Sequence, residues 1–178
     1  MNELPIDEPT SVLEFLAFPP QIKSYLELGV RCGRTIFRVS KLVDKAIGVD
    51  LSFQNLNIRK SNNIFLYEGS TDKFFKGNSD KFDLIFIDAC HEYQQVKVDL
   101  ANSMQCLNQD GFIALHDVDP CKKYLTDNSC CGNSYKITKY IYEHLNDYHF
   151  IVLHYDQSGV GILQKKLNQK HVFKIMEL

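Results

Sequence analysis

The chain has 178 residues, of which 44% are hydrophobic and 24% charged, and its formal net charge is −2. This length predicts one domain over residues 1–178, with an N-terminal helical segment (1–20) and a C-terminal tail (165–178). The balanced charge disfavours nucleic acid or an acidic membrane as an obligatory partner. No apolar run approaches the ~20 residues of a membrane span. Residues 1–10 carry no basic apolar leader, so we expect a cytoplasmic protein.

The first element expected is a short helix over Ser11–Phe18, which Pro19 and Pro20 end. Proline cannot continue a helix, because it lacks the amide hydrogen and its ring clashes with the preceding turn. Such a helix can either cover the cofactor cleft or pack on the edge of the sheet, and its sequence leaves both open.

A glycine-containing turn follows the first expected strand, Ser24–Leu28. The turn reads Glu27-x-Gly29-x-x-x-Gly33 and leads into a helix start at Thr35. Glycines let the backbone approach a bound ligand closely, so we expect these four residues to contact a cofactor. The spacing differs from the Gly-x-Gly-x-x-Gly of dinucleotide-binding proteins. A carboxylate at the strand end is a poor neighbour for a pyrophosphate but suits a cationic group.

The second expected strand, Ala46–Asp50, also ends in a carboxylate. An acidic residue in this place can accept hydrogen bonds from two ribose hydroxyls. Together with the carboxylate of Glu27, this indicates S-adenosylmethionine, a methyl donor, before a nicotinamide. A nicotinamide-dependent oxidoreductase is therefore disfavoured.

Apolar runs of strand length alternate with helical patterns along the rest of the chain. Five further strands are expected: Asn63–Tyr67, Phe82–Asp88, Gly111–His116, His149–Tyr155 and Gly159–Gln164. The alternation predicts a parallel sheet covered on both faces. Only three residues separate the last two strands, too few for a parallel crossover, so they form an antiparallel hairpin. The predicted fold class is α/β: a Rossmann-like class I methyltransferase with a seven-stranded, mostly parallel sheet and a C-terminal antiparallel hairpin.

Polar or flexible residues follow five of these strands, at the edge where open α/β sheets bind ligands. They are Glu27 with Gly29, Asp50, Gly69 with Ser70, Asp88, and His116 with Asp117. Each alone could cap a loop or a helix. Their convergence on one edge predicts a functional cleft.

Asp88 and the pair His116-Asp117 follow adjacent strands and can hold Mg²⁺ or Mn²⁺. Such an ion could orient two substrate oxygens and lower the pKa of a hydroxyl. The alternative is that Asp88 contacts the amino group of the cofactor and Asp117 caps a loop. His91, three residues past Asp88, is a candidate general base, with helix capping as its structural alternative. Asp88 and His91 are therefore the candidate catalytic residues.

Six cysteines are spread over the chain, at positions 32, 90, 106, 121, 130 and 131. The first three fall in or beside expected strands and helices, which predicts reduced, buried thiols. The other three share one loop without the Cys-x-x-Cys spacing of zinc sites. We expect ordinary loop thiols or one disulfide there rather than a metal cluster.

Two segments carry a resemblance to a known family. They read Phe-Ile-Asp-Ala-Cys-His-Glu-Tyr-Gln-Gln-Val-Lys-Val-Asp-Leu (86–100) and Asp-Gly-Phe-Ile-Ala-Leu-His-Asp-Val (110–118). With the glycine turn, they resemble the S-adenosylmethionine-dependent methyltransferases of methyltransferase family 24. Relatives of that family include sugar O-methyltransferases and cephalosporin-hydroxylase-like proteins. The likeness spans residues 24–164.

The resemblance implies cofactor contacts from three segments: Glu27, Gly29 and Gly33 at the turn, Asp50 at the ribose, and Gly69-Ser70-Thr71 beside the adenine. In the sugar enzymes, carboxylates equivalent to Asp88 and Asp117 bind a divalent metal. The chain departs from the family twice. It has Gly-Ser-Thr where Gly-Asp-Ser is common, and His116 stands where the sugar enzymes have a second acid. The second departure alters the metal shell.

The loop Val118–Asn133 is expected to supply much of the substrate surface. It contains Lys122, Lys123 and Tyr124, which suit a polar acceptor, and its length suggests a lid. The predicted function is methyl transfer from S-adenosylmethionine to an oxygen of a polar small-molecule or carbohydrate acceptor, with a homodimer left open. The alternative is a cofactor-binding but non-catalytic regulatory or partner subunit, favoured by the altered metal shell and a missing N-terminal extension.

Overall fold

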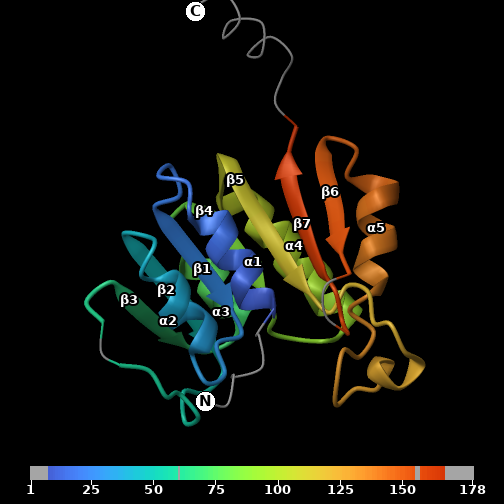
Figure 1. The fold of residues 1–178 in the computed structure, drawn as a ribbon, viewed down its shortest axis with the longest axis horizontal. Coiled ribbons are helices and arrows are strands. Elements are labelled where there is room, and N and C mark those ends of the chain that lie inside the picture. The colour runs from blue at the N-terminus through green and yellow to red at the C-terminus, as the bar shows by residue number, and fades with distance from the viewer. Residues whose placement is uncertain (1–7, 60, 155–156, 167–178) are drawn as a thin grey trace, which may run out of the picture.

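A single mixed sheet forms the centre of the molecule (Figure 1). The computed structural model describes residues 8–59, 61–154 and 157–166. Within them, seven strands lie in the order β3-β2-β1-β4-β5-β7-β6. Their bounds are β1 (Ser24–Leu28), β2 (Lys45–Asp50), β3 (Ile64–Glu68), β4 (Phe82–Ile87), β5 (Leu107–His116), β6 (Tyr148–Leu153) and β7 (Val160–Lys165). The predicted seven-stranded α/β fold is confirmed.

The strands are parallel from β3 through β5, and only β7 reverses direction against its neighbours. β1 pairs with β2 and β4, and β3 and β5 extend the parallel set on either side. β7 is antiparallel to both β5 and β6, which confirms the hairpin. The segment between its strands is longer than predicted, because β6 already ends at Leu153 and β7 begins at Val160. Tyr155, predicted to be in a strand, lies outside the described residues.

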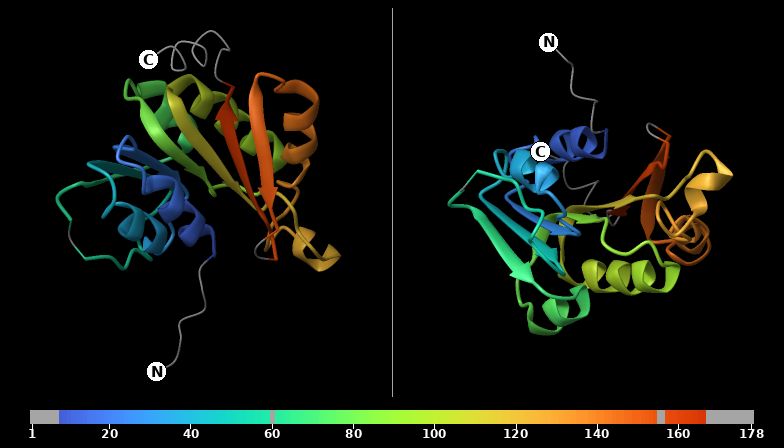
Figure 2. Two further views of the ribbon diagram at one scale, coloured as in Figure 1. Left: turned by 45° about the horizontal axis from the view of Figure 1, so that its top comes forward. Right: turned by 90° about the horizontal axis from the view of Figure 1, so that it is seen from below.

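Helices cover both faces of the sheet (Figure 2). Their bounds are α1 (Glu8–Ala17), α2 (Arg34–Val39), α3 (Thr71–Gly77), α4 (Tyr93–Cys106) and α5 (Lys136–His144), with a 3₁₀ turn at Lys123–Thr126. α1 and α2 share one apolar cluster with the sheet, and α3, α4 and α5 share the other. The predicted two-faced arrangement is therefore present.

The N-terminal helix α1 packs on the face of the sheet beside α2. Leu13 and Leu16 are buried in the same cluster as Ile36 and Val39 of α2. The hydroxyls of Thr10 and Thr35 lie 2.9 Å apart across the two helices. The helix thus lies over the inner strands β4 and β5, on the face of the sheet rather than at its edge as the second expected placement had it.

The cysteines are free thiols. Cys106 and Cys131 are buried, whereas Cys32 is exposed and Cys90 is half-buried. The expected burial is therefore wrong for Cys32, because this residue lies in the turn between β1 and α2 rather than in the helix. Neither a disulfide nor a cysteine cluster with metal-binding geometry occurs among the described residues.

Asp83, at the start of β4, ties together the amino ends of three strands. Its Oδ2 accepts hydrogen bonds from the amides of Lys23 and Ser24, both at 2.9 Å, and from the Ser24 hydroxyl at 2.8 Å. Its Oδ1 accepts one from the Asn108 amide group at 2.6 Å. Burial alone would raise the pKa of Asp83, but the hydrogen bonds from Asn108, Lys23 and Ser24 outweigh it and lower that pKa.

We predict that Asp83→Ala lowers the free energy of unfolding by ~2–3 kcal/mol at pH 7, because several hydrogen bonds to a charged acceptor are lost. A carboxyl whose folded pKa is depressed stabilises the fold above its unfolded pKa of about 3.9 and loses this contribution as pH falls through the folded value. The difference between wild type and variant should therefore shrink below about pH 4. Urea denaturation from pH 7 downward measures it.

Asp80→Ala is the matched control for this prediction. Asp80 lies three residues earlier and makes an exposed ion pair with Lys45, at 2.7 Å. Such pairs contribute about 0–1 kcal/mol. Equal losses in the two variants at pH 7 would contradict a special role for Asp83.

Candidate functional site

The turn after β1 is pinned between β2 and β4. The amide of Gly29 donates to the Val49 carbonyl at 2.8 Å, and the amide of Asp88 donates to the Leu28 carbonyl at 2.9 Å. Gly29 has φ 89°, and a Cβ there would lie 2.1 Å from the carbonyl oxygen of Asp88. Only glycine fits this contact, for reasons of both conformation and space.

Asp50, at the end of β2, holds this turn through its carboxylate. Oδ2 accepts hydrogen bonds from the amides of Val30 and Arg31, both at 2.8 Å, and Oδ1 accepts one from Ser52 at 3.1 Å. These bonds stabilise Arg31 at φ 50°, a conformation that few non-glycine residues adopt. A carboxylate has about four acceptor sites, so Asp50 can still receive donors from a ligand.

A cavity of about 250 Å³ opens beside this turn at the carboxyl edge of β2, β1 and β4. Its lining includes five of the predicted cofactor residues: Gly29, Asp50, Gly69, Ser70 and Thr71. Sequence reasoning missed six others that also line it: Val49, Leu51, Asp72, Ala89, Cys90 and Gln95. The cavity therefore lies where the sequence predicts a cofactor, with a wall from α4 that it does not predict.

Gln95 forms that wall. Its side-chain amide donates to Thr71 Oγ1 at 3.4 Å, to Asp72 Oδ1 at 3.3 Å and to Asp99 Oδ1 at 3.2 Å. It thereby joins the first turn of α4 to the start of α3. Ser70 also caps α3, since its hydroxyl accepts a hydrogen bond from Lys73. The one sequence signal for Gln95 is its place in the first turn of the helix that follows Asp88.

Four predicted cofactor residues lie outside the cavity lining: Asp88, whose carboxylate faces two histidines, and Glu27, Gly33 and Thr35. Glu27 is 1% exposed, and the Tyr25 hydroxyl donates to it at 2.5 Å. Burial, and then the charge of Glu27, raise the pKa of Tyr25, so this donor stays protonated. Gly33 has φ 82°, and a Cβ there would contact side chains of the 51–59 segment. Thr35 bonds to α1. In this structure these residues shape and support the turn.

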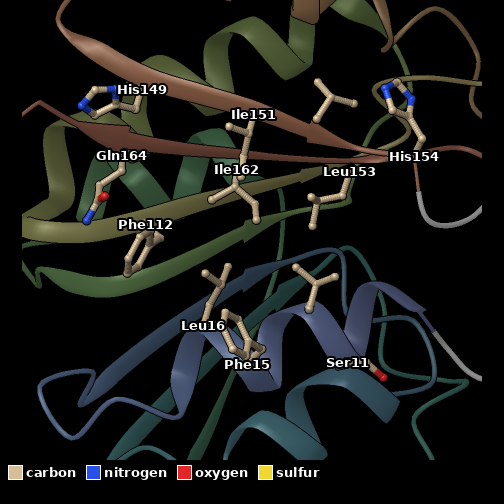
Figure 3. Close-up of a pocket in the computed structure, with 12 residues that line it drawn as sticks. Ser11, Phe15, Leu16, Phe112, His149, Ile151, Leu153, His154, Ile162 and Gln164 are labelled. Atoms are coloured by element: carbon tan, nitrogen blue, oxygen red, sulfur yellow. The ribbon is translucent and has the colours of Figure 1, made fainter.

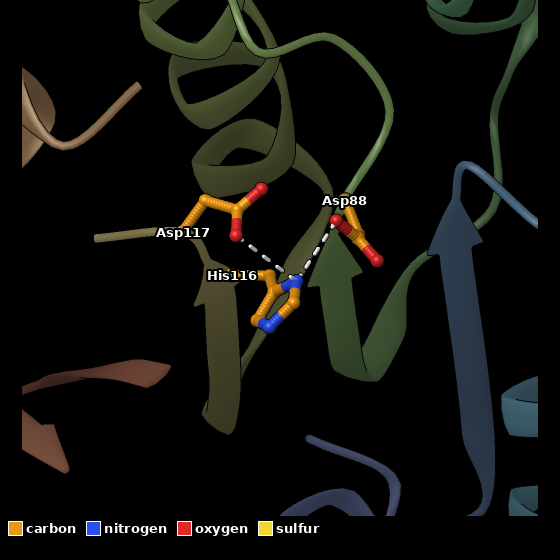
Figure 4. A group of neighbouring side chains, drawn as sticks. All are labelled: Asp88, His116 and Asp117. Atoms are coloured by element: carbon orange, nitrogen blue, oxygen red, sulfur yellow. Dashed lines mark hydrogen bonds and ion pairs between the residues drawn. The ribbon is translucent and has the colours of Figure 1, made fainter. Parts of the chain in front are cut away.

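Asp88, His116 and Asp117 come together at the ends of β4 and β5 (Figure 4). His116 Nδ1 lies 3.2 Å from Asp88 Oδ1 and 3.5 Å from Asp117 Oδ1. Asp117 is 5% exposed and has φ 58°. On the far side of the ring, His116 Nε2 lies 3.0 Å from the Ser158 hydroxyl. The His116 ring therefore contacts Ser158 of the loop before β7 on one side and the carboxylates of Asp88 and Asp117 on the other.

His91 points its imidazole into the same group. Nε2 lies 3.2 Å from Asp117 Oδ2 and 3.9 Å from Asp88 Oδ1, and Nδ1 contacts the carbonyl of Cys130. The nearby carboxylate of Asp88, against the effect of burial and with the help of Asp117, raises the pKa of His91. Burial would raise the pKa of Asp88, but the charge and hydrogen bond of His116, with the nearby His91 ring, lower it. We call these four residues, Asp88, His91, His116 and Asp117, the carboxylate–imidazole cluster.

The loop between β5 and α5 packs directly on His91. The Asn133 amide donates to the His91 carbonyl at 3.0 Å. Gly132 has φ 55°, and a Cβ there would lie 2.5 Å from the same carbonyl oxygen. Nothing in the sequence pattern indicates this contact, because 39 residues separate His91 from the Cys130 carbonyl that its ring meets.

The residues proposed for acceptor binding lie elsewhere on that loop. Lys122 and Lys123 are exposed, and Tyr124 is 60% exposed. The Tyr124 hydroxyl donates to Gln157 at 3.3 Å. Their contact with a substrate stays a prediction.

Donor atoms of Asp88, His116 and Asp117 lie within 4.8 Å of one another, so these side chains fit a divalent ion. Atoms bound to one ion at ~2.1 Å are at most about 4.2 Å apart, so small side-chain rotations would suffice. Among the described residues, no other group of three or more histidine, cysteine or acidic side chains has this geometry.

A separate groove of about 780 Å³ lies between α1 and strands β5, β7 and β6 (Figure 3). Phe15 and Leu16 face Phe112 and Ile162 across it, and Phe15 is 79% exposed. Its walls are mostly apolar and bring no pair of carboxylates together. The groove is therefore a poorer place for the predicted chemistry than the cavity and the cluster. No helix among the described residues is long and apolar enough to cross a membrane.

Comparisons with solved structures identify the fold. The chain is similar to the O-methyltransferase TomG of Streptomyces achromogenes, involved in tomaymycin synthesis and solved with S-adenosylmethionine (TM-score 0.69, 13% identity, covering 94% of this chain and 84% of that one). It is similar to an O-methyltransferase of Bacillus cereus in complex with S-adenosylhomocysteine (0.70, 13%, 92% and 83%). It also resembles an rRNA methylase of Streptococcus thermophilus (0.64, 11%, 94% and 99%). No curated protein sequence matches the chain.

A comparison with protein families identifies the family of the chain as well as its fold. Residues 26–118 match a family described as a methyltransferase domain. The matched segment runs from β1 through the end of β5, so it contains the glycine turn, Asp50 and the whole carboxylate–imidazole cluster. It covers more than half of the 178 residues. The chain therefore belongs to methyltransferase family 24, the methyltransferase-domain family that its sequence resembles.

Proposed function

We propose that this methyltransferase moves a methyl group from S-adenosylmethionine to an oxygen of a polar small-molecule or carbohydrate acceptor. One observation carries the proposal: the cavity at Gly29 and Asp50 adjoins the carboxylate–imidazole cluster through the contact of Gly29 with Asp88. A donor in the cavity and an acceptor at the cluster would lie side by side. Such alignment is the main contribution that a protein makes to group transfer.

The cavity supports an adenosyl donor. Asp50 lines it and, with three of its about four acceptor sites filled by amides, keeps one on Oδ1 for a ribose hydroxyl. Gly69, Ser70 and Thr71 form a wall for the base. Glu27 keeps a buried carboxylate at the end of β1, next to the turn where a sulfonium would bind. The two neighbouring O-methyltransferases solved with S-adenosylmethionine or S-adenosylhomocysteine support the same ligand.

The cluster supports deprotonation of the acceptor. In the transfer, the acceptor oxygen attacks the methyl carbon, the bond from carbon to sulfur breaks, and the hydroxyl proton must leave. His91 is within reach of this proton if the hydroxyl approaches Asp88 and Asp117. A divalent ion bound by Asp88, His116 and Asp117 would be the alternative to a general base, because it would orient the acceptor hydroxyl and lower the pKa of that hydroxyl.

The acceptor class follows from charge and surface. The net charge of −2 and scattered basic residues favour a small polar acceptor over nucleic acid, although one structural neighbour is an rRNA methylase. The free thiols agree with a cytoplasmic protein. Exposed Phe15 on α1 and Phe18 just after it, each 79% accessible, are side chains that a homodimer would cover.

The test of the proposal is a calorimetric titration of S-adenosylmethionine into the purified chain, with Mg²⁺ and again with EDTA. We expect binding in both. Release of S-adenosylhomocysteine is then measured with sugars, phenols and rRNA as acceptors. Binding without release for any acceptor would favour the non-catalytic subunit, and release with rRNA alone would overturn the small-molecule acceptor.

We predict that Asp50→Ala weakens S-adenosylmethionine binding by ~1–3 kcal/mol, because a charge-assisted hydrogen bond to the ribose is lost together with the amide bonds that hold the turn. This corresponds to roughly 5- to 150-fold in Kd. Titration calorimetry measures it. Asp44→Ala is the control, since Asp44 is exposed beside the other end of β2 and pairs with Lys23 at 3.8 Å. Unchanged affinity in Asp50→Ala would contradict a contact between Asp50 and the ribose.

We predict that Asp88→Asn abolishes turnover while thermal unfolding and cofactor affinity stay close to those of wild type. The amide keeps the size of the side chain but removes the charge that faces His116 and His91. Asp110→Asn, at an exposed position of β5, should leave turnover unchanged. Retained activity in Asp88→Asn would show that the Asp88 carboxylate is not a catalytic group.

A further inference from the structure

The carboxylate–imidazole cluster contains one more nitrogen donor than the three-residue metal site discussed above. Two imidazole nitrogens, His91 Nε2 and His116 Nδ1, face the same two carboxylates. His91 Nε2 lies as close to Asp117 as His116 Nδ1 lies to Asp88, at 3.2 Å in both cases. The cluster therefore offers two nitrogen and two carboxylate donors. The donor atoms of Asp88, His116 and Asp117 already form a compact group, and the His91 ring would have to move further to join it.

The outward nitrogen of each ring already has a partner. A carbonyl oxygen can only accept, so the contact with Cys130 requires the proton of a neutral His91 to be on Nδ1. Its Nε2 then directs a lone pair toward the two carboxylates. The Ser158 hydroxyl can accept from His116 Nε2, which leaves Nδ1 of that ring with the same orientation. Without an ion, protons on His116 Nδ1 and His91 Nε2 face the carboxylates, and an ion that binds at these nitrogens displaces those protons.

We propose, resting on the methyl-transfer function above, that His91 and His116 complete a two-histidine, two-aspartate site that selects a first-row transition-metal ion such as Mn²⁺, Co²⁺ or Zn²⁺ over Mg²⁺. Imidazole is a favourable ligand for these ions, whereas Mg²⁺ prefers an all-oxygen shell. Contacts like those with Cys130 and Ser158 fix the tautomer and orientation of metal-binding histidines in other sites.

The burial of the four side chains suits an ion that also meets substrate. Asp117 is buried, with its side chain 7% exposed, and the exposed fraction rises through His116 (19%) and Asp88 (30%) to His91 (35%). The protein thus surrounds the site on one side and leaves the other open to an acceptor oxygen. In this arrangement His91 holds the ion, and the open side receives the hydroxyl.

The test is a metal titration of the EDTA-treated, dialysed full chain. Isothermal calorimetry with MgCl₂, MnCl₂ and ZnCl₂ gives the affinities, and the visible absorption of CoCl₂ reports nitrogen ligands directly. We expect Zn²⁺ and Co²⁺ to bind at least about tenfold more tightly than Mg²⁺. Equal affinities for Mg²⁺ and Zn²⁺ would overturn the proposed selectivity.

Two variants remove one ligand each and keep its outer contact. His91→Asn places an amide where Nδ1 donates to Cys130, and His116→Gln places one where Nε2 meets Ser158. Each should weaken Zn²⁺ and Co²⁺ binding by about 10- to 100-fold, in line with the loss of a ligand or its support. His144→Gln is the control, since His144 is exposed on α5 and stacks on Tyr140.

The outcomes separate this inference from the proposed function. Zn²⁺ affinity that survives in both His91→Asn and His116→Gln would overturn the four-residue site, even if S-adenosylmethionine still bound. Failure of S-adenosylmethionine to bind wild type, with tight Zn²⁺ binding lost in the variants, would overturn the methyl-transfer proposal and leave the metal site. Thermal unfolding of the metal-free variants identifies any that do not fold, and the other variant then decides.

Discussion

The contact of the β1–α2 turn with the end of β4 is the constraint on which the site depends. A Cβ at Gly29 would lie 2.1 Å from the Asp88 carbonyl oxygen, so the two strand ends touch through backbone alone. Because the amide of Asp88 also bonds to Leu28, neither segment can move without the other. The cavity and the carboxylate–imidazole cluster therefore share a rigid boundary, and the separation of donor and acceptor is set by the sheet rather than by flexible side chains.

The carboxylates at this edge have two kinds of partner, backbone amides for Asp50 and imidazole rings for Asp88. Asp50 binds three amides and so fixes the conformation of the turn. Asp88 instead faces two histidines, and their charge lowers its pKa although burial opposes this. Asp83, of the same residue type, acts at the opposite edge of the sheet, where it joins strand starts. Position along the strand, more than residue type, thus separates an acid that builds the fold from one that can take part in chemistry.

The sequence predicts the fold well, because strand spacing and the short gap before β7 are local properties. It also predicts Gly29, Asp50 and Asp88, since residues at strand ends meet at one edge by topology alone. It misses Gln95, the amide contacts of Asp50 and the support from Ser158, because these depend on how helices and loops pack. The sequence also misses the contact of the Thr35 hydroxyl with Thr10 of α1, because that contact depends on how two helices pack.

The loop between β5 and α5 is less free than its length suggests. Its first residues bond to the segment before β7, since Asp119 donates to the Ser158 carbonyl at 2.7 Å. Its last residues rest on His91, through Gly132 and Asn133. A lid movement of the whole loop would break both connections and turn the His91 ring away from the carboxylates. Closure over an acceptor can therefore involve only the part around Lys122–Asp127, while the two ends of the loop keep both imidazoles aligned.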